Sequence, residues 1–378
     1  LYLFNIADGK IVEITSDGER NSIINGIADW VYEEEFSIVR AFEWNSDGTK
    51  IVFIRFDETA VPEFSMDIYG TDLYPFQYTF KYPKAGENNS VVTLHSYDIE
   101  SKEILDISLP DSYYIPRITR MNNSNYISVQ TLNRHQNNLN LYAVNLQKNS
   151  VSLIHQEKDQ AYVDVTDNLT FLPDDSFIWT SEKDGYNHIY LYSKSGELMN
   201  QITRGDWEVT NYYGYDPKRN RIYYQSTENG SINRDIYAID INAKNKKRLS
   251  SGEGTNSAEF SADFTYFINE FSNATTPRQY TLHNAKSGVK LKDILDNKKL
   301  LAKLSGYEMS PKEFSTISIN GNELNMWMVK PKDFDPSKKY PLLMFQYSGP
   351  GSQQVANKWM NSRDYWHQIL ASDGYIIA

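Results

Sequence analysis

The sequence of 378 residues contains no cysteine, which excludes disulfide bonds, thiolate metal sites and cysteine nucleophiles. No stretch approaches the roughly 18 consecutive apolar residues that a membrane-spanning helix needs. We therefore expect no membrane-spanning helix in this sequence. Basic residues are also outnumbered, because 38 Lys and Arg face 49 Asp and Glu. The resulting net charge of −11 disfavours nucleic-acid binding, since an acidic surface repels phosphates.

Aromatic residues are plentiful, at 14% of the chain, and the largest share of them is 28 tyrosines. Aromatic side chains fit the pleated, half-buried surface of a sheet, so this bias favours β-structure. Hydrophobic residues at 40% and charged residues at 23% are typical of a globular protein, and the length predicts two domains. The sequence opens at Leu1 within an expected strand and without a recognisable signal peptide. We therefore expect the natural N-terminus to lie further upstream.

A short pattern of alternating apolar residues around a tyrosine recurs along the chain, with spacings of 95, 45, 48, 47 and 43 residues. The tyrosines are Tyr2, Tyr97, Tyr142, Tyr190, Tyr237 and Tyr280. A polar turn after an apolar residue precedes the copies, as in Trp44–Gly48 and Phe260–Phe264. A period of roughly 40–50 residues with several strands per unit predicts a β-propeller. The alternative is an unrelated β-sandwich in which the tyrosine spacing arose by chance.

The gap of 95 residues is about two periods long, yet it contains one internal turn marker, at Trp44. We therefore expect one repeat unit to carry two insertions, at about residues 20–40 and 56–89. The first insertion contains Asp29–Phe36 with three consecutive glutamates, and the second is rich in Phe and Tyr. Insertions in a regular array are frequent sites of function.

The repeat stops at about residue 310, and the remaining pattern of a strand, a helix and a strand predicts the start of an α/β sheet. The expected elements are a hairpin over Thr316–Pro331 around Asn320-Gly321, a buried strand Tyr340–Tyr347, a turn Ser348–Gly351, a helix Val355–Leu370 and a strand from Gly374 to Ile377.

Four segments of the chain resemble the dipeptidyl peptidase IV family of the prolyl oligopeptidase superfamily, the S9B-type serine peptidases, in its bacterial form. Asp29–Glu35 is similar to the double-glutamate motif of that family. Phe56–Pro62 and Tyr82–Asn89 resemble the arm that follows the motif, and Lys339–Pro350 resembles the beginning of the hydrolase domain. The order and spacing of these segments agree along nearly the whole chain.

The resemblance implies a mainly β fold, an incomplete eight-bladed β-propeller followed by the start of an α/β-hydrolase domain. The propeller would occupy residues 1–310, with its first blades missing. Residues 311–378 would be the N-terminal part of a truncated hydrolase domain. The sequence is thus expected to be a fragment of a longer protein.

The glutamates of the first insertion have a specific role in the family that the chain resembles. Two carboxylates match a peptide's α-ammonium group, which carries three N–H donors and a full charge. The resemblance makes Glu34 and Glu35 this substrate-binding pair, with Glu33 outside it. The alternative is a solvated acidic run, or carboxylates that favour a helix N-terminus.

The resemblance also makes Tyr347 a catalytic residue, whose hydroxyl donates to the oxyanion of acyl transfer. The alternative is a core tyrosine with a satisfied hydroxyl. No Gly-x-Ser-x-Gly motif occurs, and none of the six histidines suggests a triad. By resemblance, the Ser, Asp and His follow the end of this chain, and the arginine that holds the substrate carbonyl precedes Leu1. We therefore expect this polypeptide alone to be inactive.

The activity implied for the full-length protein is release of X-Pro or X-Ala dipeptides from peptides with a free N-terminus. The alternatives are a prolyl tripeptidyl aminopeptidase and a non-catalytic propeller that binds proteins. The resemblance implies a homodimer formed through the arm Phe56–Asn89, which could instead pack on its own propeller. No cofactor or metal site is expected, since acidic turns such as Asp47-Gly48 suit hairpins. A periplasmic, cell-surface or secreted location is expected by analogy.

Overall fold

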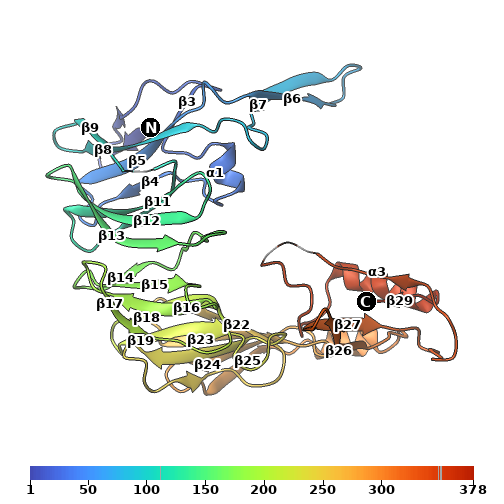
Figure 1. The fold of residues 1–378 in the computed structure, drawn as a ribbon. Helices are drawn as coiled ribbons and strands as arrows, with labels where there is room; N and C mark the ends of the chain where they lie inside the picture. Colours follow the sequence, from blue (N-terminus) through green and yellow to red (C-terminus); the bar gives the residue numbers. More distant parts are fainter. Residues whose placement is uncertain (111, 348, 350) are drawn as a thin grey trace. The chain divides into compact units, whose positions relative to one another are not determined.

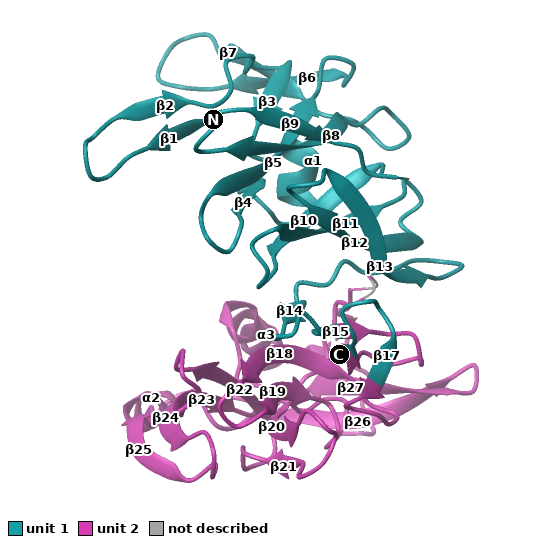
Figure 2. Ribbon diagram, turned by 90° about the vertical axis from the view of Figure 1, so that its left-hand side faces the viewer, with its two compact units in different colours: residues 1–179, 192–199 teal, residues 180–191, 200–378 magenta. Residues whose placement is uncertain are grey.

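The computed structural model describes residues 1–110, 112–347, 349 and 351–378. Within those residues the chain is mainly β, with strands β1 to β29 and helices α1 to α3 (Figure 1). It divides into two compact units (Figure 2). Unit 1 contains residues 1–179 and 192–199, and unit 2 contains residues 180–191 and 200–378.

Four sheets have the same construction, in which four consecutive strands lie side by side in sequence order. Four-stranded sheets of this kind are the units of which β-propellers are built. The first is β10 (Tyr114–Arg120), β11 (Tyr126–Leu132), β12 (Asn138–Asn145) and β13 (Ser150–Lys158), and the second is β14 (Thr170–Phe171), β15 (Phe177–Ser181), β16 (His188–Tyr192) and β17 (Leu198–Gln201). The third is β18 (Val209–Asp216), β19 (Arg221–Ser226), β20 (Asp235–Asp240) and β21 (Lys247–Arg248), and the fourth is β22 (Thr255–Phe260), β23 (Tyr266–Ser272), β24 (Gln279–Asn284) and β25 (Lys290–Leu295).

The repeat predicted from the tyrosine spacing corresponds to these sheets. In each of the four, the recurring tyrosine lies on the third strand, and the polar turn joins the first strand to the second. Tyr142, Tyr190 and Tyr237 are buried, and Tyr280 is half-buried. The prediction of a repeated β-unit is thereby confirmed.

A further sheet carries the two insertions and explains the long gap in the repeat. It contains β3 (Ile23–Asn25), β4 (Phe42–Trp44), β5 (Lys50–Asp57), β8 (Val91–Asp98) and β9 (Ile104–Ile107). Helix α1 (Trp30–Glu34) lies between β3 and β4 in the chain, and the two-stranded ribbon β6 (Glu63–Ile68) and β7 (Phe76–Lys81) lies between β5 and β8. The ribbon projects away from its sheet (Figure 1). A separate pair, β1 (Tyr2–Phe4) and β2 (Ile11–Glu13), precedes this sheet.

The first insertion interrupts what is otherwise one edge strand. Strands β3 and β4 both pair antiparallel with β5, with Asn25 opposite Arg55 and Phe42 opposite Phe53. At the interruption, the Gly26 amide donates to the Ile54 carbonyl and the Ile54 amide donates to the Ala41 carbonyl, each at 2.9 Å. The loop with α1 therefore leaves and rejoins the sheet at a single point opposite Ile54.

Each unit has its own apolar core built from interior strands. In unit 1, β5 buries Phe53, Ile54 and Phe56 almost completely. In unit 2, Tyr223 and Phe267 pack in one cluster with smaller apolar side chains of the neighbouring strands. Burial of such side chains is the main favourable contribution to folding.

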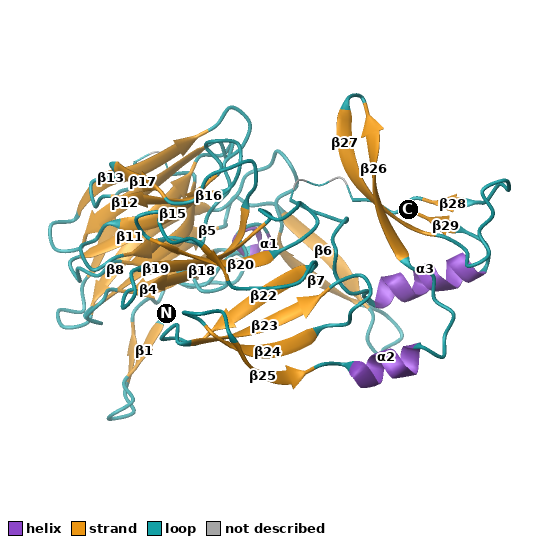
Figure 3. Ribbon diagram, turned by 90° about the horizontal axis from the view of Figure 1, so that it is seen from below, coloured by secondary structure: helices purple, strands orange, loops and turns teal. Residues whose placement is uncertain are grey.

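The last part of unit 2 forms a mixed sheet with strand order β26-β27-β29-β28 (Figure 3). Its elements are β26 (Lys312–Ile319), β27 (Asn322–Val329), β28 (Leu342–Leu343), α3 (Ser362–Ser372) and β29 (Ile376–Ile377), preceded by α2 (Lys298–Leu304). Strands β26 and β27 form the hairpin expected around Asn320-Gly321, whose positive φ angles of 52° and 82° suit a two-residue turn. Strands β28 and β29 pair parallel, with α3 between them in the chain.

Two expectations for this region were wrong in extent. The predicted buried strand Tyr340–Tyr347 shrinks to Leu342–Leu343, and Leu342 is 58% exposed. The physical reason is its place at the sheet edge, where β28 pairs only with β29 among the described residues. The predicted helix Val355–Leu370 begins only at Ser362, because Asn361 and Asp364 form a capping box that fixes its start. In the predicted turn Ser348–Gly351, Ser348 and Pro350 lie outside the described residues.

The predicted domain boundary at residue 310 does not coincide with the division into units, which falls between residues 179 and 200. The assignment of residues 1–310 and 311–378 to two domains remains a prediction. So does the number of propeller blades in the full-length protein.

Candidate functional site

Helix α1 begins at Trp30 because the side chain of the preceding residue, Asp29, caps its first turn. Asp29 has an extended backbone, and its Oδ1 accepts a hydrogen bond from the Tyr32 amide at 2.9 Å. A capping aspartate satisfies an amide that would otherwise have no partner. Glu33 in the first turn adds a favourable charge near the positive end of the helix.

The inner face of α1 is held by Tyr32, which is 2% exposed. Its hydroxyl accepts a hydrogen bond from the Ile115 amide at 2.8 Å, and burial raises the pKa of this phenol well above its ordinary value. Its ring packs edge-on against Phe36 and Phe56, with centroids 5.1 and 4.8 Å away. With this face fixed, the three glutamates face outward.

Glu33, Glu34 and Glu35 are all exposed. Glu35 follows the helix as its C-cap, and it lines a cavity of about 910 Å³ in unit 1. Glu34 is not among the described residues that line this cavity. The structure thus presents both predicted substrate-binding carboxylates to solvent at the end of α1, and their pairing around an ammonium group remains a prediction.

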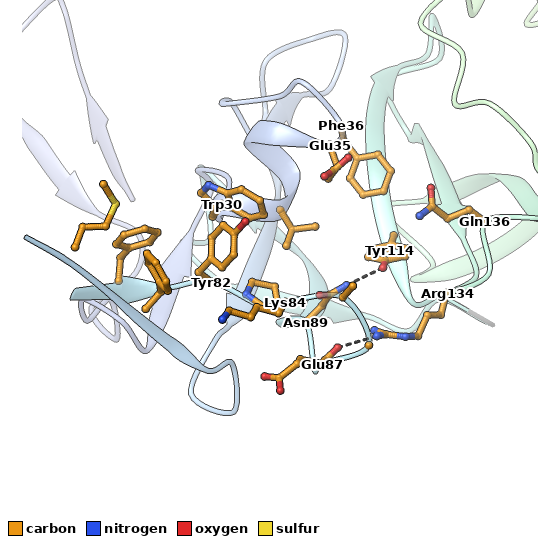
Figure 4. Close-up of a pocket in the computed structure, with 17 residues that line it drawn as sticks. Trp30, Glu35, Phe36, Tyr82, Lys84, Glu87, Asn89, Tyr114, Arg134 and Gln136 are labelled. Carbon is orange, nitrogen blue, oxygen red and sulfur yellow. Dashed lines mark hydrogen bonds between the residues drawn. The ribbon is translucent and has the colours of Figure 1, made fainter. Parts of the chain in front are cut away.

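One wall of the cavity is apolar and aromatic. The Trp30 and Tyr82 rings lie 4.2 Å apart between centroids, and the Phe64 ring of β6 lies 5.6 Å from Tyr82 (Figure 4). Met66 and Phe80, also on the ribbon, extend this wall. Side chains of the ribbon therefore form part of the same cavity as Glu35.

The opposite wall is polar and comes from β10 and the loop after β11. The Asn89 amide donates to the Tyr114 hydroxyl at 2.7 Å, and the Arg134 guanidinium donates to the Glu87 carbonyl at 2.7 Å (Figure 4). Arg134 also donates to the Tyr113 hydroxyl. Sequence reasoning missed Tyr114 and Arg134, because they come from a sheet outside both insertions and no local spacing links them to Glu35.

Tyr162 is a second residue that sequence reasoning missed. Burial raises the pKa of its phenol, and the nearby carboxylates Asp164 and Glu35 raise it further. Because the charge of Glu35 acts on the pKa of Tyr162, we include Tyr162 among the residues that surround Glu35. Tyr162 as a whole is 54% exposed.

Two carboxyl groups close to each other in unit 1 are buried. Asp29 is 5% exposed and accepts a hydrogen bond from the Ser90 hydroxyl at 2.6 Å, and burial raises the pKa of its carboxyl group. Glu58, at the start of the second insertion, is 6% exposed. Burial raises the pKa of Glu58, and the charge of Asp29 raises it further while Lys81 lowers it.

Tyr347 lies in unit 2, four residues after β28, and its side chain is 65% exposed. Tyr347 is therefore not buried by the described residues of this chain, and its role as an oxyanion donor remains a prediction. Gly349 packs against its ring, because a Cβ atom at Gly349 would lie 2.5 Å from Tyr347 Cε1. The missing side chain of Gly349 thus leaves room for this ring orientation.

The family model for the N-terminal region of dipeptidyl peptidase IV matches residues 1–278. The chain belongs to the dipeptidyl peptidase IV family. Within this family, it is similar to the crystal structure of Porphyromonas gingivalis dipeptidyl peptidase 4, with a TM-score of 0.93 and 43% sequence identity over 98% of this chain and 52% of that one.

Curated fungal relatives agree with this assignment to the dipeptidyl peptidase IV family. A "Probable dipeptidyl-aminopeptidase B" of Phaeosphaeria nodorum is 32% identical over all of this chain and 45% of the relative. Dipeptidyl-aminopeptidase B of Aspergillus niger is 29% identical over the same shares. The chain therefore spans about half the length of the family members that it matches.

The part of this family member that the structure describes shows no group of three or more His, Cys, Asp or Glu side chains arranged to hold a metal ion. Among the described residues, no helix has both the length and the apolar character needed to cross a bilayer.

Proposed function

We propose that the full-length protein is a serine exopeptidase that releases X-Pro and X-Ala dipeptides from the N-terminus of peptides. The observation that carries this proposal is the position of the exposed residues Glu34 and Glu35 at the end of helix α1, whose inner face is fixed by Tyr32. Membership of the dipeptidyl peptidase IV family supports it. In this proposal, the Ser, Asp and His of the triad lie outside the chain, so the chain alone is inactive.

The two glutamates would select substrates by their free amine. A protonated α-amino group offers three N–H donors, and fixed carboxylates accept them in short, charge-assisted hydrogen bonds. With the amine held, only a peptide bond at a fixed distance reaches the nucleophile. The same contact would therefore set the length of the released product at two residues.

Tyr347 would serve the chemical step. When a serine hydroxyl attacks the carbonyl carbon, negative charge develops on the carbonyl oxygen. An accessible phenol can donate a hydrogen bond to that oxygen, and Tyr347 is accessible. Its place after β28 fits the rule that α/β sheets bind ligands beyond the carboxyl ends of their strands.

The fold proposal follows the family. Residues 1–310 would belong to an eight-bladed propeller, and the parallel pair β28 and β29 with α3 would begin the α/β-hydrolase domain. The full-length protein would act in the periplasm, at the cell surface or after secretion. The parallel pair of β28 and β29 is the feature observed in this chain that supports the start of such a domain.

The ribbon would form a homodimer. Apolar side chains gather towards its tip, where Tyr69, Leu73, Tyr74 and Phe76 are 60–89% exposed. Exposed apolar patches of this kind mark interaction surfaces. An arm that packed on its own propeller would bury these side chains within the chain, so their exposure favours a second copy as the partner.

The test compares full-length protein on Gly-Pro-anilide and on its N-acetylated form. Acetylation removes the charge and two of the three donors, so we expect at least a hundredfold lower kcat/KM for the acetylated substrate. Equal turnover of the two substrates would overturn the role given to the glutamates. A preference for Ala-Ala-Pro-anilide would instead indicate a tripeptidyl aminopeptidase, and no turnover of any substrate would indicate a binding scaffold.

A further inference from the structure

Helix α1 has five residues, too few to be stable by itself, since an isolated helix of fewer than about 12 residues is marginal in water. Its position must come from contacts with the rest of unit 1. Tyr32 supplies one anchor on the sheet that begins with β10. Two further anchors come from the segment that follows the ribbon, residues 82–90.

The first of these anchors is Ser90, immediately before β8. Its hydroxyl donates to Asp29 Oδ2 at 2.6 Å, while the Tyr32 amide donates to Asp29 Oδ1 at 2.9 Å. One carboxyl group therefore joins the start of α1 to the end of the second insertion. Ser90 and Asp29 are 7% and 5% exposed, so water does not compete easily for this bond.

The second anchor is Tyr82, immediately after β7. Its ring lies 4.2 Å from the ring of Trp30, the first residue of α1. It also contacts Phe64 of β6 and Phe80 of β7, at 5.6 and 6.1 Å between centroids. A continuous series of rings thus runs from both strands of the ribbon to the helix.

We propose that Ser90 and Tyr82 are positioning residues for Glu34 and Glu35, so that the base of the ribbon sets the orientation in which the amine is bound. This inference rests on the proposed function. Neither residue needs to contact the substrate, because each acts through α1, Ser90 by way of Asp29 and Tyr82 by way of Trp30.

The proposal predicts a particular kinetic pattern. The glutamates would hold the amine equally in the ground state and in the transition state, and loss of such uniform binding raises KM while kcat is unchanged. A variant that merely loosened the sheet would lower the amount of folded enzyme and leave KM unaltered. The division between KM and kcat therefore separates a positioning role from a structural one.

The experiment uses full-length protein with Ser90→Ala and, as matched control, Ser65→Ala. Ser65 also loses a hydroxyl hydrogen bond, to Thr79 Oγ1 at 2.8 Å, but within the exposed ribbon and away from α1. For Gly-Pro-anilide, we expect KM to rise roughly tenfold in Ser90→Ala with kcat within about twofold, the scale of one hydrogen bond to a charged group. Ser65→Ala should match the wild type, and Ser90→Thr, which keeps the hydroxyl, should restore most of the affinity.

A second pair of variants keeps the test independent of how well Ser90→Ala folds. Tyr82→Leu removes the ring beside Trp30, whereas Tyr78→Leu removes a ribbon ring that contacts Phe80 at 5.6 Å. Only Tyr82→Leu should raise KM for Gly-Pro-anilide. It should also lower the ratio of kcat/KM for the free amine to kcat/KM for the acetylated substrate.

The inference is overturned if KM and amine preference in Ser90→Ala and Tyr82→Leu equal those of their controls while the wild-type enzyme prefers the free amine. If the wild-type enzyme itself shows no such preference, the proposed function fails, and the inference fails with it. The ratio of kcat/KM for the free and the acetylated substrate, measured on the wild-type enzyme, distinguishes failure of the inference from failure of the proposed function.

Discussion

The Tyr32 hydroxyl accepts a hydrogen bond from the Ile115 backbone amide at 2.8 Å, across 83 residues of sequence. Substitution Tyr32→Phe leaves that buried amide without a partner, which costs about 1–3 kcal/mol. We expect the opening free energy of the Ile115 amide, measured by hydrogen exchange, to fall by about this amount. Tyr69→Phe, at a position 79% exposed, is the control and should change nothing. Unchanged protection of Ile115 would contradict the role of this bond.

The three consecutive glutamates allow an internally controlled test of amine binding. In the full-length protein, Glu34→Gln and Glu35→Gln should each raise KM for Gly-Pro-anilide by roughly tenfold to a hundredfold, because each removes one charged acceptor. Glu33→Gln removes the same charge from the first turn of α1 and should alter KM by less than about threefold. Steady-state kinetics check this, and three equal effects would argue for a general charge effect over a specific pair.

Burial of Asp29 makes stability depend on pH in a predictable direction. Its folded-state pKa lies above the ordinary value of 3.8, so its favourable contribution is present below that value and is lost as the pH rises through the folded pKa. Asp29→Asn, which keeps a good capping residue, should therefore gain stability relative to wild type between about pH 3 and pH 7. Urea denaturation of the chain at both pH values measures this difference.

Asp57 is the control with the opposite sign. Hydrogen bonds from the Thr59 side chain and amide lower the pKa of its carboxyl group, so its contribution is present above the ordinary value and is lost as the pH falls. Asp57→Asn should lose stability relative to wild type over the same rise in pH. Parallel trends for the two variants would be inconsistent with these opposite pKa shifts.

The close approach of Gly349 to Tyr347 predicts a defect in the chemical step. Gly349→Ala would place a Cβ atom 2.5 Å from Tyr347 Cε1, and the ring would have to move. In the full-length protein we expect kcat to fall by roughly tenfold to a hundredfold with KM nearly constant, as when an oxyanion donor is displaced. Gly306→Ala is the control, because its Cβ would meet its nearest neighbour at 3.7 Å. Full activity of Gly349→Ala would contradict the oxyanion role of Tyr347.

The exposed ribbon tip predicts a change in oligomeric state. Leu73→Asp places a charge in the apolar patch, where Leu73 is 89% exposed, and should convert a dimer of the full-length protein to monomer. Leu198→Asp, on β17 and 52% exposed, introduces the same charge outside the ribbon and should leave the dimer intact. Sedimentation velocity distinguishes the two species. A dimer that survives Leu73→Asp would exclude the ribbon tip as the interface.

The repeat could be predicted from sequence because its tyrosines occupy the third strand of successive sheets. The alternation of apolar and polar side chains along that strand is similar in each copy. The glutamates were located by their resemblance to a family motif, whereas the hydrogen bond by which Asp29 caps helix α1 at the Tyr32 amide emerged only from the structure. The extent of the strand at Tyr340–Tyr347 could not be predicted, because its burial depends on neighbouring strands that its own residues do not encode.

The surroundings of Glu35 were also beyond sequence reasoning. Tyr114, Arg134 and Tyr162 reach the site from positions 79 to 127 residues further along the chain, and their own local patterns are those of ordinary strands and loops. Long-range contacts of this kind leave no periodic signal. The resemblance located Glu34 and Glu35, and the fold was needed to show the helix and what surrounds it.

The helix insertion leaves its sheet and returns to it at one point, where Gly26 and Ala41 are joined by a hydrogen bond at 3.1 Å. Excision of residues 27–40 would consequently splice β3 and β4 into an uninterrupted edge strand. The sheet and the acidic insertion are thus separable modules, and under the proposed function a single insertion or deletion would add or remove amine selectivity without rebuilding the sheet.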